Sequence, residues 1–283
     1  MASDKGPMKA WADLLRLQEY LPLFIFSALA GALLATKRID LHLASLLLFV
    51  AFSSMSAFVL NDIMDEEEDR AREDWRNPIA SGRLKRKDAF LAFTILALLS
   101  LVLLPFMELS VAVIGISTVL LLSTYSWGPR LKDKPVLDLL THGAGPALYA
   151  LMGYALYKSL DMTSLLLAGI AFLLSCTSCI LQQVRDMDTG AYAAKRTTSL
   201  IGVERSIDLA MALMLISIMI YVLMVSIGAL PLIFAIFIPS GVILLEPLLK
   251  LKTGAVKPEE VIKALRLRGS LLAAIMLLLY LIS

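Results

Sequence analysis

Charged residues and histidine are scarce in this sequence of 283 residues. Asp, Glu, Lys and Arg make up 18% of the chain, whereas soluble domains carry about 25%. This number of charged residues is too small to cover the surface of a soluble protein of this length. The composition therefore excludes an ordinary soluble enzyme, a disordered chain and a nucleic-acid-binding module. Hydrophobic residues reach 59% and the mean hydropathy is +0.80. The composition therefore indicates a polytopic membrane protein.

Cysteine is equally scarce. Cys176 and Cys179 form one C-x-x-C pair inside an apolar run, and no second pair completes a zinc site. The apolar flanks favour helix packing over redox chemistry. A cleavable signal peptide is not expected either, because the first apolar run is too long for one and no cleavage site of small residues follows it.

Nine apolar stretches are each long enough to cross a membrane as a helix of about 20 residues. Short breaks at 105–108 and 228–231 predict tight helical hairpins. The sequence thus predicts an all-α membrane protein with nine transmembrane helices around a central cavity. The predicted spans are 12–36, 43–62, 89–107, 110–127, 138–157, 164–185, 206–227, 230–249 and 264–282.

Basic residues are distributed very unevenly between the two predicted faces of the membrane. If the N-terminus lies inside, all of the 26 Lys and Arg fall inside except Lys37, Arg38 and Lys158. This asymmetry predicts a cytoplasmic N-terminus, an external C-terminus and a location in the plasma membrane. Acidic residues gather on the same inner face, and eight of the 24 Asp and Glu lie between Asp62 and Asp74.

The second span ends in an acidic motif, Asn-Asp-Ile-Met-Asp-Glu-Glu-Glu-Asp-Arg, at 61–70. On a helix that continues at 100° per residue, four oxygen-bearing side chains share an arc of about 100°: Asn61, Asp62, Asp65 and Asp69. Clustered carboxylates repel one another unless a cation lies among them, and hard oxygen ligands suit Mg²⁺. Seven basic residues follow within 70–87, and metal-binding acids beside phosphate-binding bases suggest a diphosphate site. An acidic helix end projecting into water is the alternative.

The sixth span ends in a second polar motif. Gln182 and Asp186 are four residues apart and share a helix face, and Lys195 and Arg196 follow. Both motifs end an even-numbered span at the same predicted membrane face. Two such clusters facing one pocket would bind two or more Mg²⁺ and hold one diphosphate. An ordinary helix end with loop charges is again the alternative.

At these residues the chain resembles the UbiA superfamily of intramembrane prenyltransferases, and most closely its archaeal-type members. The first motif fills every position of that family's pattern N-D-x-x-D-x-x-x-D. The resemblance covers nearly the whole chain and implies one membrane domain over 1–283, with halves at about 8–127 and 138–283. Further matching segments are Arg16, Arg76-Asn77-Pro78 with Ser81-Gly82-Arg83, Tyr125-Ser126 with Pro129-Arg130-Leu131-Lys132, and Arg196-Thr197.

The second motif departs from the family pattern. The family commonly has D-x-x-x-D there, and Asp186 matches the first Asp, but Gly190 occupies the second position. Asp188 is a candidate substitute if the helix unwinds near Gly190. On a regular helix its side chain would point about 160° away from that of Asp186.

The resemblance implies Mg²⁺-dependent transfer of an isoprenyl chain from its diphosphate to a lipophilic acceptor at the cytoplasmic face of the bilayer. The implied metal ligands are Asn61, Asp62, Asp65, Asp69, Asp186 and Asp188. The implied substrate-binding residues are Arg16, Asn61, Arg70, Arg76, Arg130, Gln182, Lys195 and Arg196. The candidate catalytic residues are Asp65, Asp69, Tyr125, Lys132 and Asp138.

Two of these candidates have specific alternatives. The ring of Tyr125 could stabilise an allylic cation, although aromatic side chains in membrane helices are more often packing residues. Asp138 could orient or deprotonate the acceptor, or it could be an acid favoured by the dipole at a helix start. His142 lies one turn beyond Asp138 and is a weaker candidate for a base.

The acceptor is the least constrained part of the hypothesis. The segment 61–82 favours a digeranylgeranylglyceryl phosphate synthase type, and a quinone-forming transferase acting on 4-hydroxybenzoate or a naphthoate is the alternative. A transporter of cations or anionic lipids is a further alternative of another class. Transporters place ionisable groups near the midplane, whereas here the acids lie at the ends of spans. The D-x-x-D-G-x-x-A-R pattern of CDP-alcohol phosphotransferases is absent.

Overall fold

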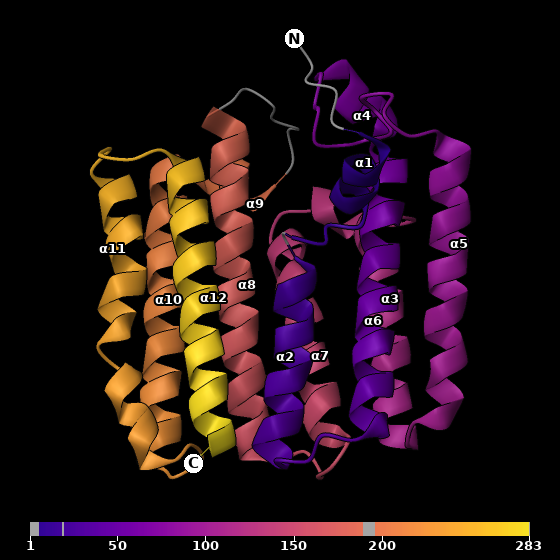
Figure 1. The fold of residues 1–283 in the computed structure, drawn as a ribbon. Helices are drawn as coiled ribbons and strands as arrows, with labels where there is room; N and C mark the ends of the chain where they lie inside the picture. Colours follow the sequence, from indigo (N-terminus) through magenta and orange to yellow (C-terminus); the bar gives the residue numbers. More distant parts are fainter. Residues whose placement is uncertain (1–5, 19, 189–195, 283) are drawn as a thin grey trace. The chain divides into compact units, whose positions relative to one another are not determined.

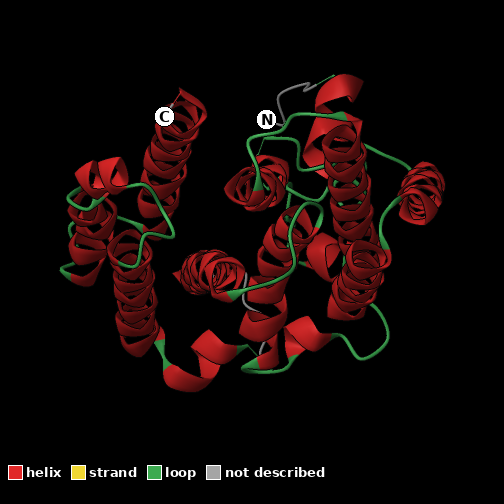
Figure 2. Cartoon of the chain, turned by 90° about the horizontal axis from the view of Figure 1, so that it is seen from below, coloured by secondary structure: helices red, strands yellow, loops and turns green. Residues whose placement is uncertain are grey.

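The computed structural model describes residues 6–18, 20–188 and 196–282, apart from the side chain of Asp188. Within these ranges the chain forms helices, turns and loops, with no strand (Figures 1 and 2). This confirms the all-α prediction. The chain divides into two compact units, which are described one at a time.

The first unit comprises the residues up to Leu131 together with Leu148–Ser159. Helix α3 is its centre and contacts α1, α2, α4, α5 and α6. Figure 1 shows α1 and α4 at the same end of α3. Its helices are α1 (Pro7–Leu14), α2 (Leu21–Ala35), α3 (Leu41–Met64), α4 (Glu66–Ala71), α5 (Arg86–Leu103), η1 (Leu104–Phe106), α6 (Leu109–Ser126) and the second half of α7 (Leu137–Ala155).

The second unit comprises Lys132–Ala147 and the chain from Leu160 onward. Helices α8, α10, α11 and α12 run side by side in it (Figure 1). Both cysteines are free and buried in its apolar core, which confirms the packing interpretation. Its helices are the first half of α7, α8 (Met162–Asp188), α9 (Thr197–Ile201), α10 (Val203–Ser226), η3 (Leu232–Phe237), α11 (Ser240–Lys252) and α12 (Pro258–Ile282); η2 (Leu131–Asp133) lies at the boundary between the units.

Seven helical segments are long and apolar enough to cross a membrane within the described residues. They correspond to the second, third, fourth and sixth to ninth predicted spans. Helix α2 is apolar but has only 15 residues, a length of about 22 Å against a hydrocarbon core of about 30 Å. Helix α7 is 19 residues long and contains Pro146, and it is not among the seven. The predicted count of nine therefore stays a prediction.

The first predicted span, 12–36, was wrong as a single helix. Helix α1 ends at Leu14, and Arg16 takes a left-handed backbone conformation with φ of +50°. Helix α2 begins only at Leu21, with Pro22 in its first turn, where proline is tolerated. The apolar run hides this break because nothing in its hydropathy marks a change of backbone conformation at Arg16.

The eighth predicted span is also divided. The segment Leu232–Phe237 is a 3₁₀ helix, and α11 begins at Ser240 after Pro239. Proline lacks the N–H that a continuous helix needs. Both predicted hairpin breaks are confirmed, since η1 interrupts the chain at Leu104–Phe106 and Gly228 takes a φ of +74°.

Candidate active site

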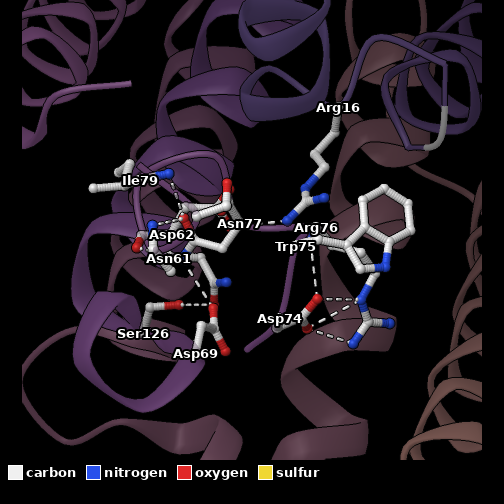
Figure 3. Close-up of polar contacts among 12 residues, drawn as sticks. Arg16, Asn61, Asp62, Asp69, Asp74, Trp75, Arg76, Asn77, Ile79 and Ser126 are labelled. Atoms are coloured by element: carbon white, nitrogen blue, oxygen red, sulfur yellow. Dashed lines mark hydrogen bonds and ion pairs between the residues drawn. The ribbon is translucent and has the colours of Figure 1, made fainter. Parts of the chain in front are cut away.

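The carboxylate of Asp62 lies near the C-terminal end of α3 and is only 1% exposed. Its Oδ1 accepts a hydrogen bond from Nη2 of Arg16 at 2.9 Å (Figure 3). Its Oδ2 has no hydrogen-bond partner among the residues that the structure describes. A buried carboxylate oxygen without a donor is costly. This oxygen is therefore well suited to bind a cation.

The break between α1 and α2 places Arg16 on Asp62. Leu14 at the end of α1 is fully buried and packs with Val59 and Ile63 of α3. This contact anchors α1 against the last turns of α3. The left-handed turn at Arg16, which non-glycine residues rarely adopt, then starts immediately beside Asp62.

Asn77 connects the two ends of the first acidic motif. Its Nδ2 donates to the backbone carbonyl of Asp62 at 2.8 Å and to Oδ2 of Asp69 at 2.9 Å (Figure 3). Its Oδ1 accepts from the backbone N–H groups of Ile79 and Ala80. Asn77 thus ties the loop after α4 to the acids, a function that the sequence did not predict. The Asn-Pro dipeptide at 77–78 signals only a turn.

Asn61 is held by α6. The hydroxyl of Ser126 donates to Oδ1 of Asn61 at 2.8 Å, and Ser126 follows the half-buried Tyr125 at the end of that helix. The end of α6 and the first acidic motif on α3 are therefore joined directly. Tyr125 therefore lies next to a residue bonded to Asn61, and a shared role of the two in one site stays a prediction.

The acidic motif does not lie on one uninterrupted helix, contrary to the prediction. Helix α3 ends at Met64, Asp65 bends the chain, and α4 begins at Glu66. Arg130 contacts Oδ1 of Asp65 at 3.3 Å and Oε1 of Glu68 at 3.1 Å. The predicted substrate-binding Arg130 therefore contacts the first motif, and its backbone has a left-handed φ of +46°.

The other two arginines proposed for this motif pair with other acids. Arg70 is exposed and forms an ion pair with Glu66 at 2.6 Å along α4. Arg76 grips Asp74 through its Nε and Nη2 (Figure 3). Burial raises the pKa of Asp74, but the hydrogen bonds from Arg76 outweigh this effect and hold the pKa below its usual value. These ion pairs of Arg70 and Arg76 are thus with acids other than the predicted metal ligands.

The described residues hold no group of three His, Cys, Asp or Glu side chains arranged as a metal site, so the predicted convergence of three carboxylates is not seen there. Arginines instead neutralise Asp62 and Asp65. The donors still fit Mg²⁺, which prefers carboxylate and amide oxygens. Oδ2 of Asp62 has no partner among the described residues, and Asn77 links the carbonyl of Asp62 to the carboxylate of Asp69. The donor set of the first motif therefore fits this ion.

The second motif is partly described. Asp186 contacts Arg185 at 2.8 Å and Arg196 at 3.8 Å, and Gln182 donates to the hydroxyl of Ser178. The structure thus brings Asp186 and Arg196, two of the predicted site residues, close together. The side chain of Asp188, together with Gly190 and Lys195, lies outside the described residues, so the predicted substitution of Asp188 for Gly190 stays a prediction.

The carboxylate of Asp138 accepts four hydrogen bonds and is 0% exposed. Its Oδ2 accepts from the backbone N–H of Thr197 and from Nε2 of Gln183, each at 2.8 Å. Its Oδ1 accepts from its neighbour Leu139 and from the hydroxyl of Thr197. The sequence pointed to Gln182 rather than Gln183, yet Gln183 is the buried member of the pair.

The remaining candidates, Lys132 and His142, lie just before α7 and in its first half. Lys132 is buried in the turn Leu131–Asp133. His142 exchanges a hydrogen bond with the hydroxyl of Ser175 at 2.9 Å, within the packing of α7 against α8. A role of His142 as a base stays a prediction.

Residues 24–263 match the model of the UbiA prenyltransferase family. The chain therefore belongs to this family and is a membrane-embedded prenyltransferase. This membership selects the enzyme over the transporter hypothesis. No curated protein matches the chain.

Solved structures share the fold. A UbiA homologue from Archaeoglobus fulgidus bound to GPP and Mg²⁺ is 20% identical, with a TM-score of 0.72 over 94% of this chain and 97% of that one. A digeranylgeranylglyceryl phosphate synthase is 21% identical, with a TM-score of 0.73 over 98% of both chains. The apo UbiA homologue from Aeropyrum pernix K1 is 15% identical, with a TM-score of 0.77 over 92% and 97%. At these identities the similarity shows the fold alone.

Proposed function

We propose that the protein is a Mg²⁺-dependent prenyltransferase of the digeranylgeranylglyceryl phosphate synthase type, which moves an isoprenyl chain from its diphosphate to a lipophilic acceptor in the bilayer. The observation that carries the proposal is the buried Asp62 of a complete N-D-x-x-D-x-x-x-D motif, because no described residue donates a hydrogen bond to its Oδ2. The arginines on its flanks support it, because an anion-binding site beside metal ligands suits a diphosphate.

Asn61, Asp62, Asp65 and Asp69 would hold Mg²⁺ in the first motif, and Asp186 and Asp188 are the candidate ligands in the second. The ion, when bound, neutralises diphosphate charge and so makes diphosphate a better leaving group. Solved structures of the same fold were obtained with GPP or DMAPP and Mg²⁺, which supports this choice of metal and donor class.

Arg16 and Arg130 are the best placed cations of the first motif. Each touches an acid of the motif, Asp62 or Asp65. Guanidinium groups bind phosphate oxygens in a forked geometry. We expect these arginines to exchange their carboxylates for phosphate oxygens when the diphosphate arrives. That exchange frees Asp65 to act as a ligand and stabilises the negative charge that develops on the leaving group.

Bond cleavage takes place at C1 of the isoprenyl group. The C1–O bond to the diphosphate breaks, and its electron pair leaves with the diphosphate. The allylic cation is stabilised by the ring of Tyr125, which lies next to the Ser126–Asn61 hydrogen bond. An acceptor hydroxyl oxygen then forms the new bond to C1 and releases its proton to the diphosphate. Water would quench the cation, so the reaction requires a dry site within the bilayer.

Several predictions about the site's setting belong to the same proposal. These are the cytoplasmic orientation of both motifs, the plasma-membrane location, a single domain over 1–283, and the roles of Lys132, Gln182 and Lys195. The asymmetry of Lys and Arg supports the orientation. That the two motifs act on one diphosphate also stays a prediction.

Turnover tests the proposal. The purified protein is incubated with Mg²⁺, with radiolabelled isoprenyl diphosphates of different chain lengths, and with glyceryl phosphate lipids, 4-hydroxybenzoate or a naphthoate as acceptors. We expect lipid product with the glyceryl phosphate lipid, and a loss on the order of 100-fold in Asp62→Ala because Mg²⁺ binding contributes several kcal/mol. Glu67→Gln, an exposed change in the same acidic run, should keep full activity. Product only with an aromatic acceptor would instead assign the quinone type, and no product with any acceptor would refute the proposal.

A further inference from the structure

Asp138 has its full complement of hydrogen bonds. An ionised carboxylate offers about four acceptor positions. Four donors fill them: the backbone N–H groups of Leu139 and Thr197, the Thr197 hydroxyl and Nε2 of Gln183. The carboxylate is also completely buried. A general base needs a free position for the proton that it takes from a substrate, and Asp138 has none.

The same hydrogen bonds fix the segment that follows Arg196. Thr197 bonds Asp138 through both its backbone N–H and its hydroxyl, and the hydroxyl also accepts from the N–H of Val136 at 2.7 Å. Oε1 of Gln183 accepts from the backbone N–H of Thr198 at 3.1 Å. Val136 has a φ of +71°, which a β-branched residue rarely adopts and which persists only where the surroundings hold it. Helices α7, α8 and α9 are thus joined at one buried point.

Arg196 is the residue immediately before this fixed segment. Its Nη1 lies 3.8 Å from Oδ2 of Asp186, and Asp186 is one turn of α8 beyond Gln183. Because Thr197 and Thr198 are hydrogen-bonded to α7 and α8, they anchor the backbone on the C-terminal side of Arg196. These hydrogen bonds therefore help to place Arg196 relative to Asp186, although the side chain of Arg196 makes none of them.

We propose that Asp138 is a positioning residue, which acts through Thr197 and Gln183 to hold Arg196 beside Asp186 for binding of the diphosphate. This inference rests on the proposed function and deepens it, because it replaces a proton-transfer role for Asp138 with a role in diphosphate affinity. It also explains why position 183 is an amide: Gln183 must donate to Asp138 and accept from Thr198 at once.

The test is Asp138→Asn together with Thr197→Val. In Asp138→Asn, the side-chain NH₂ would face the groups that donate hydrogen bonds to Asp138 in the unmodified protein. Thr197→Val removes the hydroxyl and keeps the size and shape of the side chain. We expect each variant to raise the Kd of a non-reactive isoprenyl thio-diphosphate, and the KM of the reactive diphosphate, about tenfold. The pH dependence of kcat and the KM of the acceptor should not change. The double variant should bind the thio-diphosphate no more weakly than either single variant, because both substitutions break the same hydrogen-bond network.

Matched controls separate positioning from general damage. Thr197→Ser keeps the hydroxyl and should stay within about twofold of the unmodified protein. Asp161→Asn makes the same chemical change at the other end of α8, where Asp161 caps the helix and asparagine caps equally well, so its binding should be unchanged. Thermal unfolding in detergent checks that each variant is folded.

The outcomes distinguish this inference from the proposed function. If the unmodified protein shows no Mg²⁺-dependent binding of the thio-diphosphate, the proposed function fails. If it binds, the inference is overturned by Asp138→Asn binding the analogue normally while kcat falls and loses a limb of its pH profile, which is the behaviour of a general base. If Asp138→Asn does not fold, normal binding of the thio-diphosphate by Thr197→Val overturns the inference and leaves the proposed function standing.

Discussion

At the scale of single residues, the first motif is an arrangement of acids in which each has a different local partner. Arg16 donates to one oxygen of Asp62, Arg130 contacts Asp65, and Asn77 donates to Asp69. The spacing of the acids in the sequence predicts that they share a site. It does not predict their partners, because Arg16, Asn77 and Arg130 approach from segments before and after the motif.

Asn77 offers a direct prediction at this scale. Asn77→Ala removes the donor to Asp69 and leaves the carbonyl of Asp62 and two backbone N–H groups without partners, at about 1–3 kcal/mol for each buried group left unsatisfied. We expect a lower thermal unfolding temperature and at least a tenfold weaker Mg²⁺-dependent binding of isoprenyl diphosphate. Asn77→Asp should bind more weakly still, because a carboxylate would face that of Asp69.

Glu73→Gln is the control for Asn77, since Glu73 is exposed in the same loop and should tolerate the change. Binding by Asn77→Ala at the unmodified level, with the protein folded, would show that this side chain does not position Asp69.

At the scale of helices, α2 and the second half of α7 approach each other very closely in the first unit. A Cβ built on Gly153 would lie 1.9 Å from the carbonyl oxygen of Ala28, and one on Gly31 would lie 2.0 Å from that of Ala150. Small residues at such crossings are a common means of helix association in membranes. The buried contact supports α2, which is too short to span a bilayer unaided.

A pair of identical substitutions tests this helix contact. Gly153→Ala forces α2 and α7 apart, and we expect it to destabilise the protein by about 1–3 kcal/mol, the usual range for overpacking. Gly169→Ala on α8 meets only a side-chain atom at 3.7 Å, so the better helix former should leave stability unchanged or slightly higher. Thermal unfolding in detergent compares the two, and equal melting temperatures would contradict the close approach.

At the scale of the whole molecule, composition and hydropathy predict the class and most of the helices, because apolar runs of helical length have few other folds in a membrane. They miss features that depend on backbone conformation. The turn at Arg16, the bend at Asp65 and the break at Pro239 interrupt runs or motifs that look continuous. The buried Asp138 network was missed for a similar reason, since Gln183 and Thr197 become its partners only after α8 and α9 fold against α7.

The chain belongs to a family of membrane-embedded prenyltransferases. The central claim about this protein is that Mg²⁺ and the first acidic motif together bind an isoprenyl diphosphate. Equilibrium binding of radiolabelled geranyl diphosphate to the purified protein tests it most directly, with Mg²⁺ or with EDTA, for the unmodified protein, Asp62→Asn and Glu67→Gln. The account predicts binding that requires Mg²⁺, that weakens at least tenfold in Asp62→Asn and that is unchanged in Glu67→Gln. Binding of equal strength in EDTA, or in Asp62→Asn, would contradict it.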